Sequence, residues 1–200
     1  MGNAARALAV LSRAAPVLRI PTAPDALELR VERRWDGTPV SDPRLHALVR
    51  LQARADGLAF EASLPHQARP RLPSAPPGTR VADLWEYDVV ECFVAGRDGR
   101  YLELELGAGG HFLALQFDAP RRCCDPLEGL RPALAHRADP RGWSASLLAP
   151  WSIVPAEVAA LNAFVAAGGE LLAHHPVPGP RPDFHQPQRF PAASLERDPR

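Results

Sequence analysis

The sequence predicts an all-β fold, a β-sandwich of about nine or ten short strands with short helical turns. Many short segments alternate apolar and polar residues, which is the period of a half-buried strand. Turn-forming residues separate these segments at regular spacing, as they do in sandwiches and barrels. The 200 residues, of which 46% are hydrophobic and 23% charged, fit one domain with a sizeable core.

The N-terminal part predicts an arm followed by three strands. Residues 1–25 are expected to form a loose arm or short helix, and the domain itself to span residues 26–195. Ala26–Arg33 alternates apolar and charged residues and predicts the first strand. Leu48–Ala55 and Leu58–Leu64 flank Asp56-Gly57, which is a strong hairpin signal.

The central part predicts two strands behind a proline-rich surface loop, Pro65–Gly78. Tyr101–Leu106 alternates strictly, with its leucines inward and with Tyr101, Glu103 and Glu105 on an outer face that we expect to be solvated. The glycine-rich residues 107–110 then turn the chain into a returning strand, His111–Phe117.

The C-terminal part predicts a second hairpin and a closing pair of strands. Ala133–Arg137 and Gly142–Leu148 flank a type I turn signal, and Pro155–Leu161 is expected to begin a helix. Asn162–Ala167 and Glu170–His175 are interpreted as strands, although Ala-rich stretches suit a helix equally. The proline-rich remainder is expected to wrap the surface, with residues 196–200 as a tail.

The composition argues against several functional classes. The formal net charge is zero, so nothing points to a nucleic acid or to a membrane surface as partner. Lysine is absent, which excludes a Schiff-base lysine and a P-loop lysine. Cys92, Cys123 and Cys124 form no disulfide framework, and no long apolar run resembles a secretion signal. We therefore expect a cytoplasmic protein, and the oligomeric state stays open.

The segment Leu84–Phe93 is the most informative part of the chain. It places aromatic and acidic residues at the mouth of a strand, where carboxylates are costly to bury unless they are paired or face water. The Trp85 ring could serve as a stacking platform for a ligand, or it could close the end of the core, and the sequence favours neither role. For Asp88 a salt bridge to one of the arginines is favoured over a hydrogen bond to a ligand. Glu91 shares a strand face with Val89 and Phe93, so we expect partial burial and a raised pKa.

Four motifs, taken in order, resemble the DOMON-like superfamily, which includes the family 9 carbohydrate-binding modules and related uncharacterised bacterial proteins. They are Trp85-Glu86-Tyr87-Asp88-Val89-Val90-Glu91 with Phe93; Tyr101-Leu102-Glu103-Leu104-Glu105; Gly142-Trp143-Ser144-Ala145 leading to Ala149-Pro150-Trp151-Ser152; and Asn162-Ala163-Phe164 with Pro182-Asp183-Phe184-His185 and Phe190. Each motif alone is weak, but the four together span nearly the whole chain. On this resemblance we expect a bacterial protein.

The resemblance implies a jelly-roll-like sandwich of two antiparallel sheets and a non-catalytic role in binding a carbohydrate or a similar polar ring ligand. Trp85 and Glu91 stand where such modules carry an aromatic ring and a carboxylate, and the second aromatic stays open between Trp151, Phe184 and Phe190. The candidate ligand-binding residues are Trp85, Tyr87, Asp88, Glu91, Trp151, Phe184 and His185.

No cofactor is expected. The haem-binding branch of the superfamily uses methionine with lysine or histidine, but the only methionine here is Met1 and lysine is absent. Family 9 modules also carry calcium, yet no cluster of oxygen ligands in the sequence can be assigned to it. His174 and His175 are adjacent on an expected strand, so they point to opposite faces and cannot chelate one metal.

Two alternatives to a binding module stay open. One is a sugar-acting enzyme with Glu91 and His185 as acid and base, although His185 is equally interpretable as a hydrogen-bonded residue of the C-terminal wrap. The other is a structural or interaction domain without a small ligand, for which Trp85 would be fully enclosed. Cys123-Cys124 follows two arginines but has no identifiable partner, so an inert surface pair is favoured.

Overall fold

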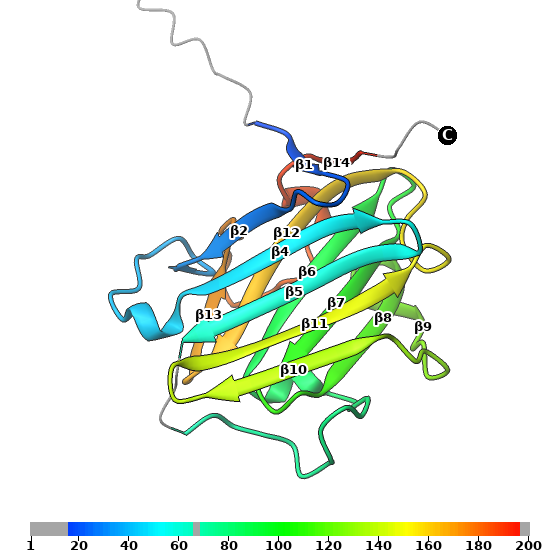
Figure 1. Ribbon diagram of the computed structural model, residues 1–200. Coiled ribbons are helices and arrows are strands. Elements are labelled where there is room, and N and C mark those ends of the chain that lie inside the picture. The colour runs from blue at the N-terminus through cyan, green and yellow to red at the C-terminus, as the bar shows by residue number, and fades with distance from the viewer. Residues whose placement is uncertain (1–15, 66–68, 197–200) are drawn as a thin grey trace, which may run out of the picture.

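The structure, a computed structural model, describes residues 16–65 and 69–196 and consists of two β-sheets packed face to face (Figure 1). The five-stranded sheet, in front in Figure 1, has the order β10-β11-β5-β4-β2 with antiparallel pairing throughout. Its strands are β2 (Leu27–Val31), β4 (Ala47–Arg54), β5 (Gly57–Pro65), β10 (Leu134–Asp139) and β11 (Gly142–Pro150).

The seven-stranded sheet lies behind it, with the order β3-β13-β12-β6-β7-β8-β9 and again antiparallel pairing (Figure 1). Its strands are β3 (Arg33–Arg34), β6 (Val89–Gly96), β7 (Tyr101–Gly107), β8 (Phe112–Ala119), β9 (Arg122–Asp125), β12 (Val158–Ala167) and β13 (Glu170–Ala173). β6 and β7 form a hairpin in the middle of this sheet, so they are its most enclosed strands.

Short elements complete the fold. β1 (Leu18–Ile20) pairs in parallel with β14 (Ala193–Leu195), which joins the two ends of the described chain. The described part of the chain contains three 3₁₀ turns, η1 (Pro43–Leu45), η2 (Leu84–Glu86) and η3 (Pro187–Arg189). Of the predicted N-terminal arm and C-terminal tail, residues 1–15 and 197–200 lie outside the described residues.

The predicted all-β sandwich of antiparallel sheets is confirmed. Of the fourteen strands in the described residues, five (β1, β3, β9, β13 and β14) have four residues or fewer, which leaves nine longer ones. The hairpin predicted at Asp56-Gly57 joins β4 to β5. Only glycine fits at position 57, because a Cβ there would collide with the Ala149 carbonyl on the neighbouring strand β11.

Two predictions at the C-terminal side are wrong. Pro155–Leu161 begins no helix: β12 starts at Val158, and the described residues contain no α-helix. Pairing with β6 overrides the helix propensity of this Ala-rich stretch, because it buries Leu161 and the apolar residues that alternate with it. The strand expected to end at His175 ends at Ala173, beyond which Asn162 hydrogen-bonds the backbone of His175.

The central strands of the seven-stranded sheet are buried on both faces. Its inner face packs on the five-stranded sheet through a core that includes Val90, Cys92, Leu102 and Leu104. Its outer face carries a second apolar cluster, hereafter the outer cluster. The outer cluster comprises the buried residues Leu84, Val89, Phe93, Ala95, Tyr101, Leu113, Leu115, Phe117, Phe164, Ala173, Val177 and Phe190.

The outer cluster overturns the prediction that Glu103 and Glu105 occupy a solvated face. Their exposed fractions are 2% and 0%. Leu84, from the loop before β6, and Val177 and Phe190, from the segment after β13, cover the outer face of the sheet. The alternation along β7 correctly separates two faces, but both turn out to be interior.

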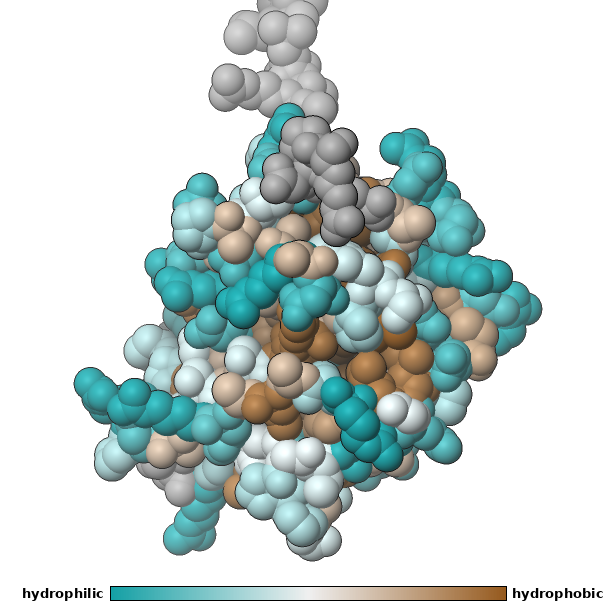
Figure 2. Space-filling model, turned by 45° about the vertical axis from the view of Figure 1, so that its right-hand side comes forward, coloured by the Kyte–Doolittle hydropathy of each residue, from teal (hydrophilic) through white to brown (hydrophobic). Residues whose placement is uncertain are grey.

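Exposed apolar side chains are few. Figure 2 shows hydrophobic residues reaching the surface between hydrophilic ones on the side turned toward the viewer. Among the described residues the large hydrophobic side chains that are exposed are Val17, Leu72 and Trp85. Trp85 also borders a cavity, as described below.

Candidate functional site

A cavity of about 510 Å³ opens on the outer face of the seven-stranded sheet. Strands β6 to β9 contribute its floor, and the segments that cover the sheet contribute its walls. The lining residues are Trp85, Glu91, Glu103, Leu115, Phe117, Arg121, Cys123, Ala166, Leu171, Pro182, Asp183, Phe184 and His185. It is large enough for a small organic ligand.

Three glutamates stand on the sheet at and beneath this floor. Glu91 on β6 is directly opposite Glu105 on β7, and Glu103 is two residues away from Glu105 on the same strand face. All three are nearly inaccessible to solvent, with Glu91 3% exposed. Glu103 Oε2 and both carboxyl oxygens of Glu105 have no hydrogen-bond partner. Unpartnered buried polar atoms are rare, so this cluster calls for a functional explanation.

Burial controls the protonation of these acids. Desolvation raises the pKa of Glu91 to about 8, as the position of this residue beside Val89 and Phe93 predicted. Desolvation, and then the charge of Glu91, raise the pKa of Glu103 well above its usual value, and Arg121 acts in the opposite direction. The pKa of Glu105 is raised by desolvation and then by the other two glutamates. At neutral pH the floor therefore consists mostly of protonated carboxyl groups.

A chain of hydrogen bonds fixes His185 at the cavity wall. The backbone N–H of Arg121 donates to Tyr101 Oη at 3.0 Å, and Tyr101 Oη lies 2.8 Å from His185 Nδ1. Since the phenol oxygen already accepts from Arg121, we assign its own proton to the bond with Nδ1. Nε2 then carries the imidazole proton and is a donor on the side of the ring away from Tyr101.

The same surroundings keep His185 neutral. Desolvation, followed by the charge of Arg121, lowers its pKa to about 4, and Asp183 acts in the opposite direction. Asp183 also accepts from the Arg121 guanidinium at 2.8 Å and from the His185 backbone N–H at 3.1 Å. Asp183 thus ties the turn between β8 and β9 to the C-terminal segment that carries His185.

Aromatic rings form the apolar part of the wall. Trp85 lies in η2, after Asp83 in a left-handed backbone conformation, and its side chain is 44% exposed. The preceding residue, Leu84, is fully buried and closes the outer cluster in its place. Phe184 stacks on the buried Phe164 with ring centroids 4.1 Å apart, so its orientation is fixed by the sheet beneath it.

The structure brings four of the seven predicted ligand-binding residues to one cavity, namely Trp85, Glu91, Phe184 and His185. The other three lie elsewhere. Tyr87 packs against the outer cluster, and Asp88 is buried at the start of β6, where it accepts backbone hydrogen bonds from Arg71 and Gly168. Trp151 donates to the carbonyls of Arg54, at the end of β4, and of Ala55, in the β4–β5 turn. A ligand-binding role for these seven residues stays a prediction.

Sequence reasoning missed Glu103, Tyr101 and Arg121 as residues of this region. A signal for the first two was present: Asp98-Gly99 joins two alternating segments, and the resulting hairpin puts Glu103 and Tyr101 on the face of Glu91. Nothing comparable marks Arg121, which is brought to His185 by the turn between β8 and β9.

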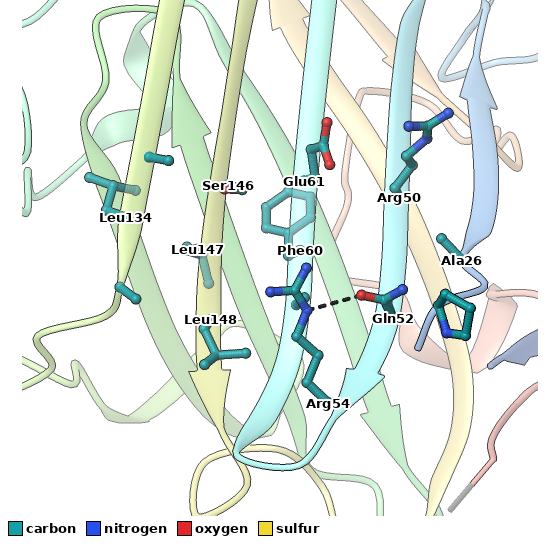
Figure 3. Close-up of a pocket in the computed structure, with 14 residues that line it drawn as sticks. Ala26, Arg50, Gln52, Arg54, Phe60, Glu61, Leu134, Ser146, Leu147 and Leu148 are labelled. Carbon is teal, nitrogen blue, oxygen red and sulfur yellow. Dashed lines mark hydrogen bonds between the residues drawn. The ribbon is translucent and has the colours of Figure 1, made fainter. Parts of the chain in front are cut away.

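A second cavity, of about 400 Å³, lies on the outer face of the five-stranded sheet (Figure 3). Two of its polar side chains are held by partners: Arg50 donates to Glu28 at 2.6 Å, and Arg54 donates to Gln52 at 2.9 Å. Figure 3 shows Arg50, Gln52 and Arg54 along β4, with the bond between Arg54 and Gln52 dashed. None of the polar side chains that line this surface is buried without a partner, so it is the weaker candidate for a ligand site.

The described residues contain no group of three or more His, Cys, Asp or Glu side chains placed to hold a metal ion. A calcium site therefore stays unassigned. Nor does any helix within residues 16–65 and 69–196 have the length and apolar character to span a bilayer. The predicted cytoplasmic location stays a prediction.

Comparison with solved structures places the fold among carbohydrate-binding modules. A candidate carbohydrate-binding protein from Bacteroides uniformis superimposes with a TM-score of 0.66 at 15% identity, covering 92% of this chain and 99% of that one. A family 9 carbohydrate-binding module from Caldicellulosiruptor kristjanssonii, solved with cellotriose, gives a TM-score of 0.54 at 15% identity, covering 92% and 96%. The resemblance to family 9 modules in fold is thus confirmed, whereas membership of the DOMON-like superfamily stays a prediction.

Comparison by sequence shows closer relatives. No family model matches the chain. The rat UPF0462 protein C4orf33 homolog is 32% identical over 178 residues, which covers 82% of this chain and 86% of the rat protein. The human UPF0462 protein C4orf33 is 30% identical over 170 residues, covering 80% and 83%. The expectation of a bacterial protein is therefore wrong, because these sequence relatives are vertebrate proteins. The chain belongs to the UPF0462 family.

Proposed function

We propose that this protein binds a carbohydrate, or a similar polyhydroxylated ring, in the cavity on the outer face of the seven-stranded sheet. The observation that carries the proposal is the pairing of two buried carboxyl groups that line the cavity, those of Glu91 and Glu103, with an exposed indole at the rim. Glu103 Oε2 has no hydrogen-bond partner, and a buried polar atom without a partner costs about 1–3 kcal/mol. A ligand rich in hydroxyl groups would offer hydrogen bonds to these two carboxyl groups.

The two kinds of wall match the two kinds of surface on a sugar ring. The C–H faces of a sugar pack against flat aromatic rings, here Trp85 and Phe184. Its hydroxyl groups both donate and accept, as protonated carboxyl groups do. Glu91 and Glu103 thus offer both functions, and His185 Nε2 adds a donor.

The comparisons support carbohydrate binding in general, but they assign no role to particular residues. The two solved structures that share the fold are a candidate carbohydrate-binding protein and a module solved with cellotriose. Their 15% identity carries the fold alone. The argument for a sugar in this chain rests on the cavity.

The test is calorimetric titration of the full-length protein with a panel of neutral mono- and disaccharides, followed by variants. Trp85→Ala is expected to weaken binding about tenfold or more, because the exposed ring is lost as a stacking surface. Leu72→Ala is the matched control, since Leu72 is also an exposed large apolar residue but does not line the cavity. Undiminished binding by Trp85→Ala would rule out this site.

A second candidate function is catalysis on a sugar-like substrate, favoured by one specific observation. Glu91 and His185 border the same cavity, with the pKa of the acid raised to about 8 and the pKa of the base lowered to about 4. At neutral pH the carboxyl group would donate a proton. The imidazole would accept one at Nε2 in its other tautomer, in which Nδ1 carries the proton and donates to Tyr101 Oη. Such opposed shifts are typical of acid–base pairs in enzymes.

Catalysis is separated from binding by turnover. Glu91→Gln keeps the shape of the carboxyl group but removes the acidic proton that it could donate. The enzyme reading therefore predicts loss of turnover with little change in substrate affinity. A substrate panel that binds but is recovered unchanged from the wild-type protein would leave binding alone.

A further inference from the structure

The ionisable groups around the cavity would be unbalanced in charge if its glutamates were ionised. The groups that line the cavity or act on its glutamates are five acids (Glu91, Glu103, Glu105, Asp83 and Asp183) and two bases (Arg80 and Arg121). The remaining titratable groups are His185, Tyr101 and Cys123. The ion pair between Arg121 and Asp183 removes one of each sign. Four acids then face one arginine, Arg80.

Arg80 acts on Glu105 and lowers its pKa, but it makes no hydrogen bond with that carboxyl group. Its guanidinium donates to the Pro126 carbonyl at 2.7 Å, and its Nε has no partner. Glu103, which lines the cavity, keeps an unpartnered buried oxygen although Arg121 is near enough to influence it. Without a further positive charge, burial keeps the floor glutamates in their protonated form.

Neutral ligands suit this floor only in its protonated form. A sugar hydroxyl fills the hydrogen-bonding needs of a carboxyl group but brings no charge. An ammonium group supplies three donors and the missing charge together. Hydrogen bonds between an ammonium and a carboxylate are roughly twice as strong as neutral ones. The rings of Trp85 and Phe184 add to this preference, because aromatic faces attract cations.

We propose that the ligand of this cavity carries a positive charge, as an amino sugar or another ring polyol with a primary ammonium group does. The ammonium group binds Glu91 and Glu103, and the ring lies against Trp85. This inference rests on the proposed carbohydrate-binding function and narrows it to cationic sugars.

The experiment compares D-glucosamine, N-acetyl-D-glucosamine and D-glucose, which differ only in the group on one ring carbon. Each is titrated into the full-length protein at pH 6.5 in two buffers of different ionisation enthalpy. Glucosamine is expected to bind about tenfold or more tightly than the other two. Because a floor carboxyl group must ionise to meet the ammonium, about one proton should leave the protein per glucosamine bound, and none with the neutral sugars.

Two variants test whether the floor glutamates cause the preference for glucosamine. Glu91→Gln and Glu103→Gln are isosteric and mimic the protonated acids, so the fold should be retained. Each is expected to reduce the preference for glucosamine, and Glu91→Gln also the proton release. Glu61→Gln, an exposed glutamate on the outer face of the five-stranded sheet, is the matched control and should leave both unchanged.

The outcomes separate this inference from the function beneath it. Equal affinity for glucosamine and the neutral sugars, or a preference that persists in both floor variants, overturns the cationic ligand and leaves sugar binding standing. Absence of binding by all three sugars and by their disaccharides overturns both. Saturable binding of CaCl₂ or MgCl₂ alone that blocks glucosamine would make the floor a metal site and also overturn the inference.

Discussion

The two sheets present opposite kinds of outer face. On the five-stranded sheet the outer face is open to water, and Arg50 there forms an ion pair with Glu28. On the seven-stranded sheet the outer face is covered, and its carboxyl groups lack partners. Both faces arise from alternating strands with acids at outward positions. The difference shows that a covering segment, and not the strand pattern, turns a row of surface acids into a cavity with shifted pKa values.

The largest expected effect concerns the packing that holds the cover in place. Phe164 is fully buried and contacts Phe93, Phe184 and Phe190. Phe164→Ala should lower the free energy of unfolding by about 3–5 kcal/mol, measured by urea denaturation. A loss below about 1 kcal/mol would mean that the cover contributes little, and that the two outer faces differ less than the structure indicates.

The next effect is a pH dependence that the five-stranded face should lack. The pKa of Glu91 rises from 4.5 to about 8 on folding. The native state therefore holds more protons than the unfolded state between these values. The stabilisation is complete below pH 4.5 and is lost as the pH rises through 8, by up to about 1.4 kcal/mol per pH unit from this residue.

The measurement is urea denaturation of the wild type and of Glu91→Gln from pH 5 to pH 9. The variant should lose part of the slope, and the difference between the two proteins should grow with pH. Parallel curves would show that Glu91 is accessible to water in solution.

The smallest effect is expected on the open face. Arg50 and Glu28 are each nearly half exposed, so their ion pair is screened by water. Glu28→Gln should change the free energy of unfolding by at most about 1 kcal/mol, and less at high salt. A larger loss would show that the open face also depends on its charges.

How much of the site follows from the sequence is best judged by comparing Glu91 with Glu103. The burial and raised pKa of Glu91 were predictable, because its neighbours on the strand face are Val89 and Phe93. Glu103 has only Tyr101 and Glu105 as such neighbours, and this pattern indicates a solvated face. The structure buries it because residues distant in the sequence, Leu84 and Phe190 among them, cover that sheet.

The positions of the aromatic residues also depended on tertiary structure. The motif around Trp85 pointed to a second aromatic but left Trp151, Phe184 and Phe190 open. The structure places Phe184 in the cavity wall, Phe190 in the outer cluster and Trp151 beside the β4–β5 turn. Their positions depend on how the C-terminal segment crosses the sheet, and local pattern carries no information on that path.

The sequence by itself determined the all-β class, most of the strands and the face on which each side chain lies, because these follow from a two-residue period and from turn chemistry within a few residues. Tertiary structure alone decided which of those faces meets water. Long-range packing laid the C-terminal segment over the seven-stranded sheet, buried Glu103 and Glu105, and set His185 against Tyr101. Desolvation depends on everything that surrounds a group, so the chemistry of this cavity emerges only when the whole chain is folded.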